Sequence, residues 1–218
     1  LVTGVQTCAL PICCFNSGNM AIKTALPYIN DELKGVWIRP TEVNSEQIIS
    51  TLDKLHDNGF NNVFIETYYH GKTIFPSKTM NKYGFTVQNE LFEGFDPLKV
   101  WVEEAHKRGI KVHTWFQSFY VGNKNPNLTQ SSILAQHPQW GNKTKKCADC
   151  EGATMSEAEH NGYFLDPANP DVQNFLLELI TEIITEYHPD GINLDYIRYP
   201  QAISASPSGN WGDRKSVV

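Results

Sequence analysis

The stretch "GINLDYIRYP", residues 191–200, decides how the rest of the chain is interpreted. Ile192 and Leu194 alternate with Asn193 and Asp195, and this period of two predicts a β-strand. A carboxylate that is buried without a partner costs several kcal/mol of stability. We therefore expect Asp195 to lie at the end of its strand, where hydrogen bonds and solvent stabilise the charge.

Three earlier segments also predict strands, and all four alternate with helical patterns. Apolar and aromatic runs occupy residues 35–39, 61–70 and 110–117. Helical spacing with capping residues and terminal glycines covers residues 44–59, 96–109 and 169–191. Strands that alternate with helices at this spacing predict βαβ units and a parallel sheet.

The two faces of the predicted strands differ in composition, and this difference selects between two ways of completing the sheet. One face is aliphatic, whereas the other carries aromatic and polar side chains: Trp37, Arg39, Phe64, Glu66, Tyr68, His113, Trp115, Gln117, Asn193 and Asp195. A doubly wound sheet has helices on both faces and would be aliphatic on both. A (β/α)8 TIM barrel, with its site at the C-terminal mouth, explains the asymmetry. No G-x-G-x-x-G motif follows the first strand, and we expect no cofactor.

The sequence predicts that only part of this α/β barrel is present. A whole barrel takes about 250 residues, so four or five strands correspond to the N-terminal half to two-thirds. Both ends of the chain look like translated sequencing adapter rather than protein. We therefore expect an adapter-like artefact at 1–13, a lead-in at 14–32, a partial barrel at 33–212 and an adapter-like artefact at 213–218.

Composition excludes several classes of partner. The formal net charge of −6, without an extended basic cluster, argues against a nucleic-acid surface. The sequence contains no run of about 18 apolar residues, so no transmembrane segment is predicted.

Cys147 and Cys150 form a C-x-x-C pair, which could be half of a zinc site, a small disulfide or two free thiols. Because the sequence has no second pair of this kind, a structural zinc site is disfavoured.

The predicted mouth of the barrel combines carboxylates with aromatic and amide side chains, a mixture suited to sugar cleavage. Asp195 and Glu66 are the candidate catalytic carboxylates, since this chemistry needs one acid and one nucleophile or stabilising charge. A structural ion pair of Asp195 with Arg198 or Arg39 is the alternative. Aromatic rings, among them Phe116 and Tyr120, could stack on sugars or simply pack. The candidate substrate-binding residues are Arg39, Tyr68, His113, Trp115, Gln117, Asn193, Arg198 and Tyr199.

The motifs "GVWIRP", "VFIETYYHGKTIFPS", "KVHTWF", "LDPANPDV" and "DGINLDYIRYP" together resemble glycosyl-hydrolase-like family 10, found in bacterial envelope lipoproteins. The resemblance runs from about Leu33 to Trp211. It implies a glycosidase, with a polysaccharide or oligosaccharide substrate such as peptidoglycan glycan strands, and a location outside the cytoplasm. The last motif is also similar to α-amylase-type barrels, which implies that Asp195 is the nucleophile.

The general acid is not assigned from the sequence. In α-amylase-type barrels it comes from the strand after the nucleophile, which this chain does not reach, and the candidates present are Glu66 and Asp166. Asp166 is more typical of a residue that caps the following loop. Two other functions stay open: a non-catalytic glycan-binding barrel, and a metal-dependent hydrolase with His113, Asp195 and Glu66 as ligands.

Overall fold

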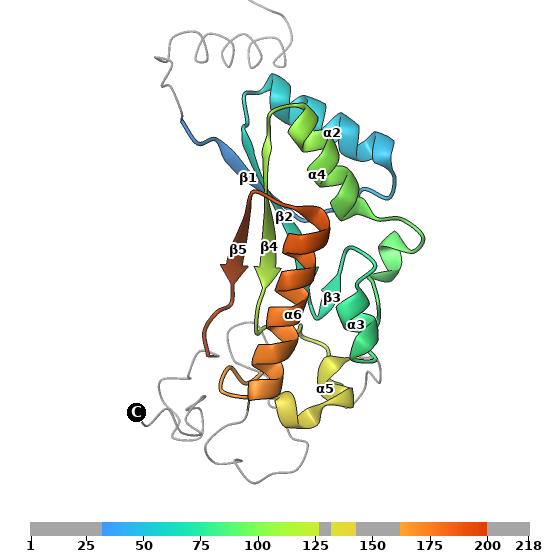
Figure 1. Ribbon diagram of the computed structural model, residues 1–218, viewed down its shortest axis with the longest axis vertical. Coiled ribbons are helices and arrows are strands. Elements are labelled where there is room, and N and C mark those ends of the chain that lie inside the picture. The colour runs from blue at the N-terminus through green and yellow to red at the C-terminus, as the bar shows by residue number, and fades with distance from the viewer. Residues whose placement is uncertain (1–31, 127–131, 143–161, 200–218) are drawn as a thin grey trace, which may run out of the picture. The chain divides into compact units, whose positions relative to one another are not determined.

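The computed structural model describes residues 32–126, 132–142 and 162–199 (Figure 1). The chain divides into two units, Leu1–Leu33 and Lys34–Val218, and all of the described helices and strands lie in the second. The predicted artefacts at 1–13 and 213–218, nearly all of the lead-in, and the pair Cys147 and Cys150 lie outside the described residues.

The second unit alternates strands and helices in the order that the sequence predicts. Its strands are β1 (Gly35–Ile38), β2 (Asn62–Tyr69), β3 (Lys72–Thr73), β4 (Lys111–Gln117) and β5 (Gly191–Asp195). Its α-helices are α2 (Ser45–Asp57), α3 (Lys78–Lys82), α4 (Pro97–Lys107), α5 (Ile133–Gln136) and α6 (Pro170–Tyr187), and two short 3-10 helices cover Glu90–Phe92 and Pro138–Trp140.

Four strands form a parallel sheet in the order β1-β2-β4-β5, and β3 pairs antiparallel with β2. Helix α2 connects β1 to β2, α4 lies between β2 and β4, and α6 lies between β4 and β5. Parallel neighbours require such crossover connections. The sheet thus contains the three βαβ units that the sequence predicts, and β1 and β5 are its edges within the described residues.

The long helices begin at the capping residues that the sequence indicates. The side chain of Asn44 accepts a hydrogen bond from the Gln47 N–H at 3.0 Å at the start of α2. Asp96 and Asn169 cap α4 and α6 in the same way, each followed by a proline in the first turn. Each cap satisfies a backbone N–H that has no partner within the helix.

One face of the sheet is covered by helices and forms the hydrophobic core. Val63, Ile65 and Val112 are fully buried there, in one cluster with Ile48 of α2 and Leu179 of α6. In Figure 1 the long helices lie to one side of the sheet. Among residues 32–126, 132–142 and 162–199 the long helices form one layer, as expected of a barrel-type parallel α/β sheet; a doubly wound fold places helices on both faces.

The opposite face is concave, and a bond between its edge strands demonstrates the curvature. The indole Nε1–H of Trp37 on β1 donates to Oδ1 of Asn193 on β5 at 3.2 Å. Four strands spaced by about 4.8 Å would hold the edges of a flat sheet roughly 14 Å apart, beyond the reach of these two side chains. The sheet therefore curves toward the face that carries the polar and aromatic residues.

Candidate active site

Asp195 is the last residue of β5, and uncharged donors hold its carboxylate. Trp115 Nε1–H donates to Oδ2 at 3.0 Å, and the backbone N–H of Tyr196 donates to Oδ1 at 2.8 Å. The carbonyl of Asp195 also accepts from the Ser118 N–H at 2.9 Å, which ties the ends of β4 and β5 together. The Asp195 carboxylate is half-buried and fixed in orientation. Its negative charge is stabilised by these two N–H donors and by partial exposure to solvent.

Glu66 lies on the same face, but its carboxylate is enclosed. Its side chain is 0% exposed, and it forms a two-point ion pair with Arg39, one bond from Nε and one from Nη2 at 3.2 Å. Gln117 Nε2–H also donates to Glu66 Oε1, at 3.1 Å. Burial raises the pKa of Glu66, the Arg39 guanidinium opposes this, and the nearby charge of Asp195 raises the pKa further. Glu66 is therefore placed to orient Arg39 and Gln117 rather than to contact a substrate.

Tyr68 is not on the polar face, contrary to the alternation of the sequence. The pairing of β2 with β4 shifts between Glu66 and Tyr68, so Tyr68 pairs with Phe116 instead of Gln117. One extra residue on one strand reverses the side-chain alternation beyond it. Tyr68 is consequently fully buried in the core and stacks on Phe116 with ring centroids 4.7 Å apart. Neither ring is available as a stacking platform for a sugar.

His113 lies two layers below the mouth, a second correction to the expected cluster. It pairs in register with Gly191 at the start of β5, whereas Gln117 pairs with Asp195. Its Nε2 contacts Oδ1 of Asn62 at 2.8 Å, and its ring stacks on Phe64 at 4.7 Å. His113 thus fills the floor of the concave face, four register pairs below the pair of Gln117 and Asp195.

The remaining candidates lie between these positions and the rim. Trp115 and Asn193 pair in register above the floor. Trp115 donates a hydrogen bond to Asp195, and Asn193 accepts one from Trp37. Arg198 is exposed, with its guanidinium carbon 5.5 Å from the centre of the Tyr196 ring, and it donates to the carbonyl of Tyr199 at 3.2 Å. The structure thus gathers Asp195, Glu66, Arg39, Gln117 and Trp115 at the mouth.

A row of aromatic side chains, here called the aromatic rim, consists of Tyr69, His70, Tyr120 and Tyr196. Sequence reasoning considered only Tyr120 among them and missed the other three. The Arg39 guanidinium carbon lies 4.1 Å from the centre of the Tyr69 ring, and His70 stacks on Tyr69 at 3.7 Å. The rings of Tyr120 and His70 form a T-shaped pair with centroids 5.3 Å apart, and Tyr120 stacks on Tyr196 at 4.8 Å. The rim therefore runs without a break from Arg39 to the residue after Asp195. Gly71 directly after a strand signals a turn, but no local pattern indicates the row of rings.

Asp166 has the capping role that its sequence context predicts. Its Oδ1 accepts from the Ala168 N–H at 3.0 Å, and its carbonyl accepts from the Asn169 N–H at 3.1 Å. This turn leads directly into α6. A carboxylate engaged in the turn is a poor candidate for the general acid.

The described residues contain no group of three or more His, Cys, Asp or Glu side chains that could hold a metal ion. Of the proposed ligands, Glu66 is enclosed by Arg39 and Gln117, and His113 is engaged with Asn62 in the floor. The arrangement does not fit the expectation of a three-ligand metal centre at these residues.

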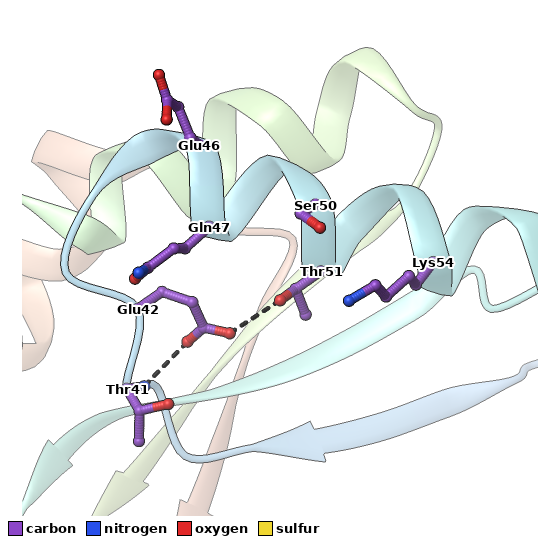
Figure 2. A pocket seen from close by; sticks show the side chains of 7 residues that line it. All are labelled: Thr41, Glu42, Glu46, Gln47, Ser50, Thr51 and Lys54. Atoms are coloured by element: carbon purple, nitrogen blue, oxygen red, sulfur yellow. Dashed lines mark hydrogen bonds between the residues drawn. The ribbon is translucent and has the colours of Figure 1, made fainter.

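A separate hollow of about 480 Å³ lies beside α2 (Figure 2). The carboxylate of Glu42 bonds on one side to the backbone N–H of Thr41 at 2.9 Å and on the other to Oγ1 of Thr51 at 3.0 Å. These bonds attach the loop after β1 to the helix. The lining holds no aromatic ring on which a sugar could stack: Thr41, Glu42, Glu46, Gln47, Ser50, Thr51 and Lys54.

A curved parallel α/β sheet with polar and aromatic side chains at the C-terminal ends of its strands is the architecture of a TIM-type barrel with a site at its mouth. The chain belongs to the glycosyl hydrolase-like 10 family, whose sequence profile matches residues 30–210. The family resemblance noted in the sequence is thereby confirmed.

Two relatives are themselves called glycosyl hydrolases. The chain is 28% identical over 186 residues to glycosyl hydrolase DigH of Escherichia coli (strain K12), covering 79% of this chain and 39% of that protein. It is 24% identical over 191 residues to glycosyl hydrolase YngK of Bacillus subtilis (strain 168), covering 79% of this chain and 34% of that protein. The chain thus spans between about a third and two fifths of the length of these relatives.

Solved structures show the same fold. A hypothetical protein from Ruminiclostridium thermocellum ATCC 27405 matches with a TM-score of 0.57 and 20% identity, over 76% of this chain and 78% of that one. The maltogenic α-amylase AmyB from Thermotoga neapolitana matches with a TM-score of 0.51 and 14% identity, over 76% of this chain and 39% of that one. At these identities the likeness concerns the fold alone, which is that of a TIM barrel.

Proposed function

We propose that this chain forms part of a glycosidase barrel that hydrolyses O-glycosidic bonds of a polysaccharide, with Asp195 as the reacting carboxylate. The observation that carries the proposal is the fixation of Asp195 at the C-terminal end of β5 by Trp115 and Tyr196. Active sites of barrel enzymes are built at this end of the strands. The family's hydrolase-like character and the names of the relatives support the same function.

In the proposed reaction, positive charge develops at the anomeric carbon as the bond to the leaving oxygen breaks. The Asp195 carboxylate attacks this carbon or stabilises its charge, and water supplies the hydroxyl group of the product. A second carboxyl group must protonate the leaving oxygen. Glu66 and Asp166 have other engagements, so we place the acid on the strand that follows β5 in a complete barrel. We also propose that the strands of this chain form only part of the complete barrel.

The substrate proposed is the glycan strand of peptidoglycan, as the family resemblance implies. Because such a substrate lies outside the cytoplasm, we also propose an extracytoplasmic location for the protein. Within the described part of the chain, no helix is long and apolar enough to cross a membrane.

A non-catalytic glycan-binding barrel is the second candidate. It is favoured by the enclosure of the Glu66 carboxylate, which leaves Asp195 without an accessible second acid beside it among the described residues. Such a module would keep the aromatic rim and Arg39 without any need for the charge of Asp195.

The test uses the product of the longest open reading frame that contains this sequence. The purified protein is incubated with peptide-free peptidoglycan glycan strands, chitin and starch, with and without EDTA, and new reducing ends are measured. Release from glycan strands, unaffected by EDTA, is the expected result. Binding without release would establish the glycan-binding module, and release abolished by EDTA would point to the metal-dependent alternative. Neither binding nor release would overturn the proposed function.

A further inference from the structure

The tip of the hairpin between β2 and β3 presents a histidine at a backbone position that favours another residue. Tyr69 pairs with Lys72, and the two residues between them have positive φ values, 50° at His70 and 72° at Gly71. These angles define a type I′ turn, in which asparagine followed by glycine is strongly preferred. The turn alone therefore gives no reason for histidine at this position.

The imidazole ring of His70 is held in one orientation. It stacks on Tyr69 with ring planes 17° apart, and it packs against the Tyr120 ring in a T-shaped contact. On another side it meets the backbone of Gly122, where an added Cβ would lie 3.2 Å from the Cβ of His70. A ring that is fixed in this way loses little further conformational entropy when it binds a ligand.

Both ring nitrogens of His70 are available. Within the described residues neither nitrogen forms a hydrogen bond, although the residue is half-buried; the backbone N–H of His70 donates to Gln117 Oε1 at 3.4 Å. Burial, together with the positive charges of Arg39 and Lys124, lowers the pKa of His70 to about 4. At neutral pH the ring is uncharged and offers one donor and one acceptor, the same pair of functions as a sugar hydroxyl group.

His70 is linked to Asp195, the candidate reacting group, through Gln117 and Tyr120. Gln117, which accepts from the His70 backbone, pairs in register with Asp195 and also donates to Glu66. Tyr120, which contacts the His70 ring, stacks on Tyr196 next to Asp195. The hairpin tip is thus part of the wall of the proposed site.

We propose that His70 binds a hydroxyl group of the sugar unit that lies against the aromatic rim, and so contributes to substrate specificity. The inference rests on the proposed function and adds to it a binding residue that the sequence did not indicate. A neutral, fixed imidazole discriminates against a sugar that lacks the hydroxyl group, because the ring nitrogens would then remain unpaired.

Two substitutions separate binding from folding. His70→Asn supplies the residue that the turn prefers, and His70→Phe keeps a flat ring but removes both nitrogens. We expect His70→Asn to leave the melting temperature unchanged or raised, because the turn is retained. Both variants, made in an Asp195→Asn background that prevents turnover, should bind peptide-free peptidoglycan glycan strands about tenfold more weakly. With active enzyme the loss should appear mainly in KM.

His188→Asn is the matched control, because His188 also has a φ of 50° but lies exposed at the end of α6. Binding should be unaffected in this variant. Equal affinity of His70→Phe and the parent protein for the strands would overturn the inference alone, as would a large fall in melting temperature for His70→Asn with unchanged binding. Failure of the parent protein to bind the strands, chitin or starch would overturn both the inference and the proposed function.

Discussion

Trp115 of β4 holds the carboxylate of β5: its indole Nε1–H lies 3.0 Å from Oδ2 of Asp195. The backbone N–H of Tyr196 bonds to the other oxygen, Oδ1, at 2.8 Å. Two donors on two oxygens fix the plane of the carboxylate as well as its position. The aromatic side chain that sequence reasoning assigned to sugar contact thus has a second task in orienting Asp195.

Replacement of Trp115 by phenylalanine tests this task, because it keeps an aromatic ring and removes the N–H donor. A hydrogen bond to a charged group contributes about 1.5–3 kcal/mol, so we expect kcat to fall by roughly one to two orders of magnitude with little change in KM. Trp37→Phe is the matched control, since it removes an indole bond to Asn193 on the same strand. Steady-state kinetics measure both. Equal losses in the two variants would contradict the orienting role of Trp115.

The charge of Asp195 is tested by Asp195→Asn. We expect turnover of glycan strands to fall by about a thousandfold or more, because the lost interaction is strongest when positive charge develops in the transition state. Asparagine has one acceptor oxygen for two N–H donors, so unfolding should become easier by only about 1 kcal/mol. Kinetics and thermal unfolding are measured on the same variant.

Glu42→Gln serves as the control for Asp195→Asn, since Glu42 is another carboxylate that bonds to a backbone N–H after a strand of this sheet. It should keep its activity. Near-normal turnover of Asp195→Asn with a lowered melting temperature would instead assign Asp195 a structural role.

The order of the strands and the helical face were predictable because they depend on local periodicity. Alternation in residues 61–70 and 110–117 correctly separates core positions such as Val63 and Val112 from the polar face. Tyr68 shows where such reasoning stops, since the irregularity between Glu66 and Tyr68 has no glycine or proline to announce it. The shift results from pairing with β4, which the sequence of β2 alone does not specify.

The depth of a residue in the sheet was also beyond prediction from alternation. His113 and Gln117 share one face, yet one lies in the floor and the other at the mouth, because register with β5 sets their heights. The aromatic rim depends on the same tertiary pairing. Its members come from the ends of three strands, and only the folded sheet brings Tyr69, Tyr120 and Tyr196 into one row.

The ion pair of Arg39 and Glu66 predicts an effect of pH on stability. Arg39→Met leaves the enclosed carboxylate of Glu66 without its charged partner, and we expect a loss of about 2–3 kcal/mol in the free energy of unfolding at pH 7, since Arg39 is itself half-exposed. Burial raises the pKa of Glu66 in the folded state. The folded variant therefore keeps a proton that the unfolded chain releases near pH 4.3, and stability falls as the pH rises above that value.

Urea unfolding of Arg39→Met at pH 4 and pH 7 measures this difference against the parent protein. The double variant Arg39→Met/Glu66→Gln should recover most of the stability at pH 7, because a neutral amide can remain buried with its bond to Gln117. A pH-independent loss in Arg39→Met, or no recovery in the double variant, would show that the pair does not stabilise the fold in this way.

Gly191 provides a test of the floor. A Cβ at this position would lie 2.6 Å from Nδ1 and 3.3 Å from Cε1 of His113, closer than van der Waals contact allows. The His113 ring cannot easily move away, because it stacks on Phe64 and contacts Asn62. Gly191→Ala should therefore reduce the free energy of unfolding by about 1–3 kcal/mol, the usual cost of overpacking, although alanine suits a strand better than glycine.

The double-mutant cycle with His113→Ala isolates the cause. Removal of the ring costs stability by itself, through the lost stacking and the lost bond to Asn62, but it opens the space that the Cβ needs. In the His113→Ala background, Gly191→Ala should cost nothing or stabilise the protein slightly, which gives a coupling energy of about 1–3 kcal/mol between the two sites. Thermal and urea unfolding of the four proteins measure it. An equal cost of Gly191→Ala in both backgrounds would refute the contact between Gly191 and His113 as the reason for glycine at the start of β5.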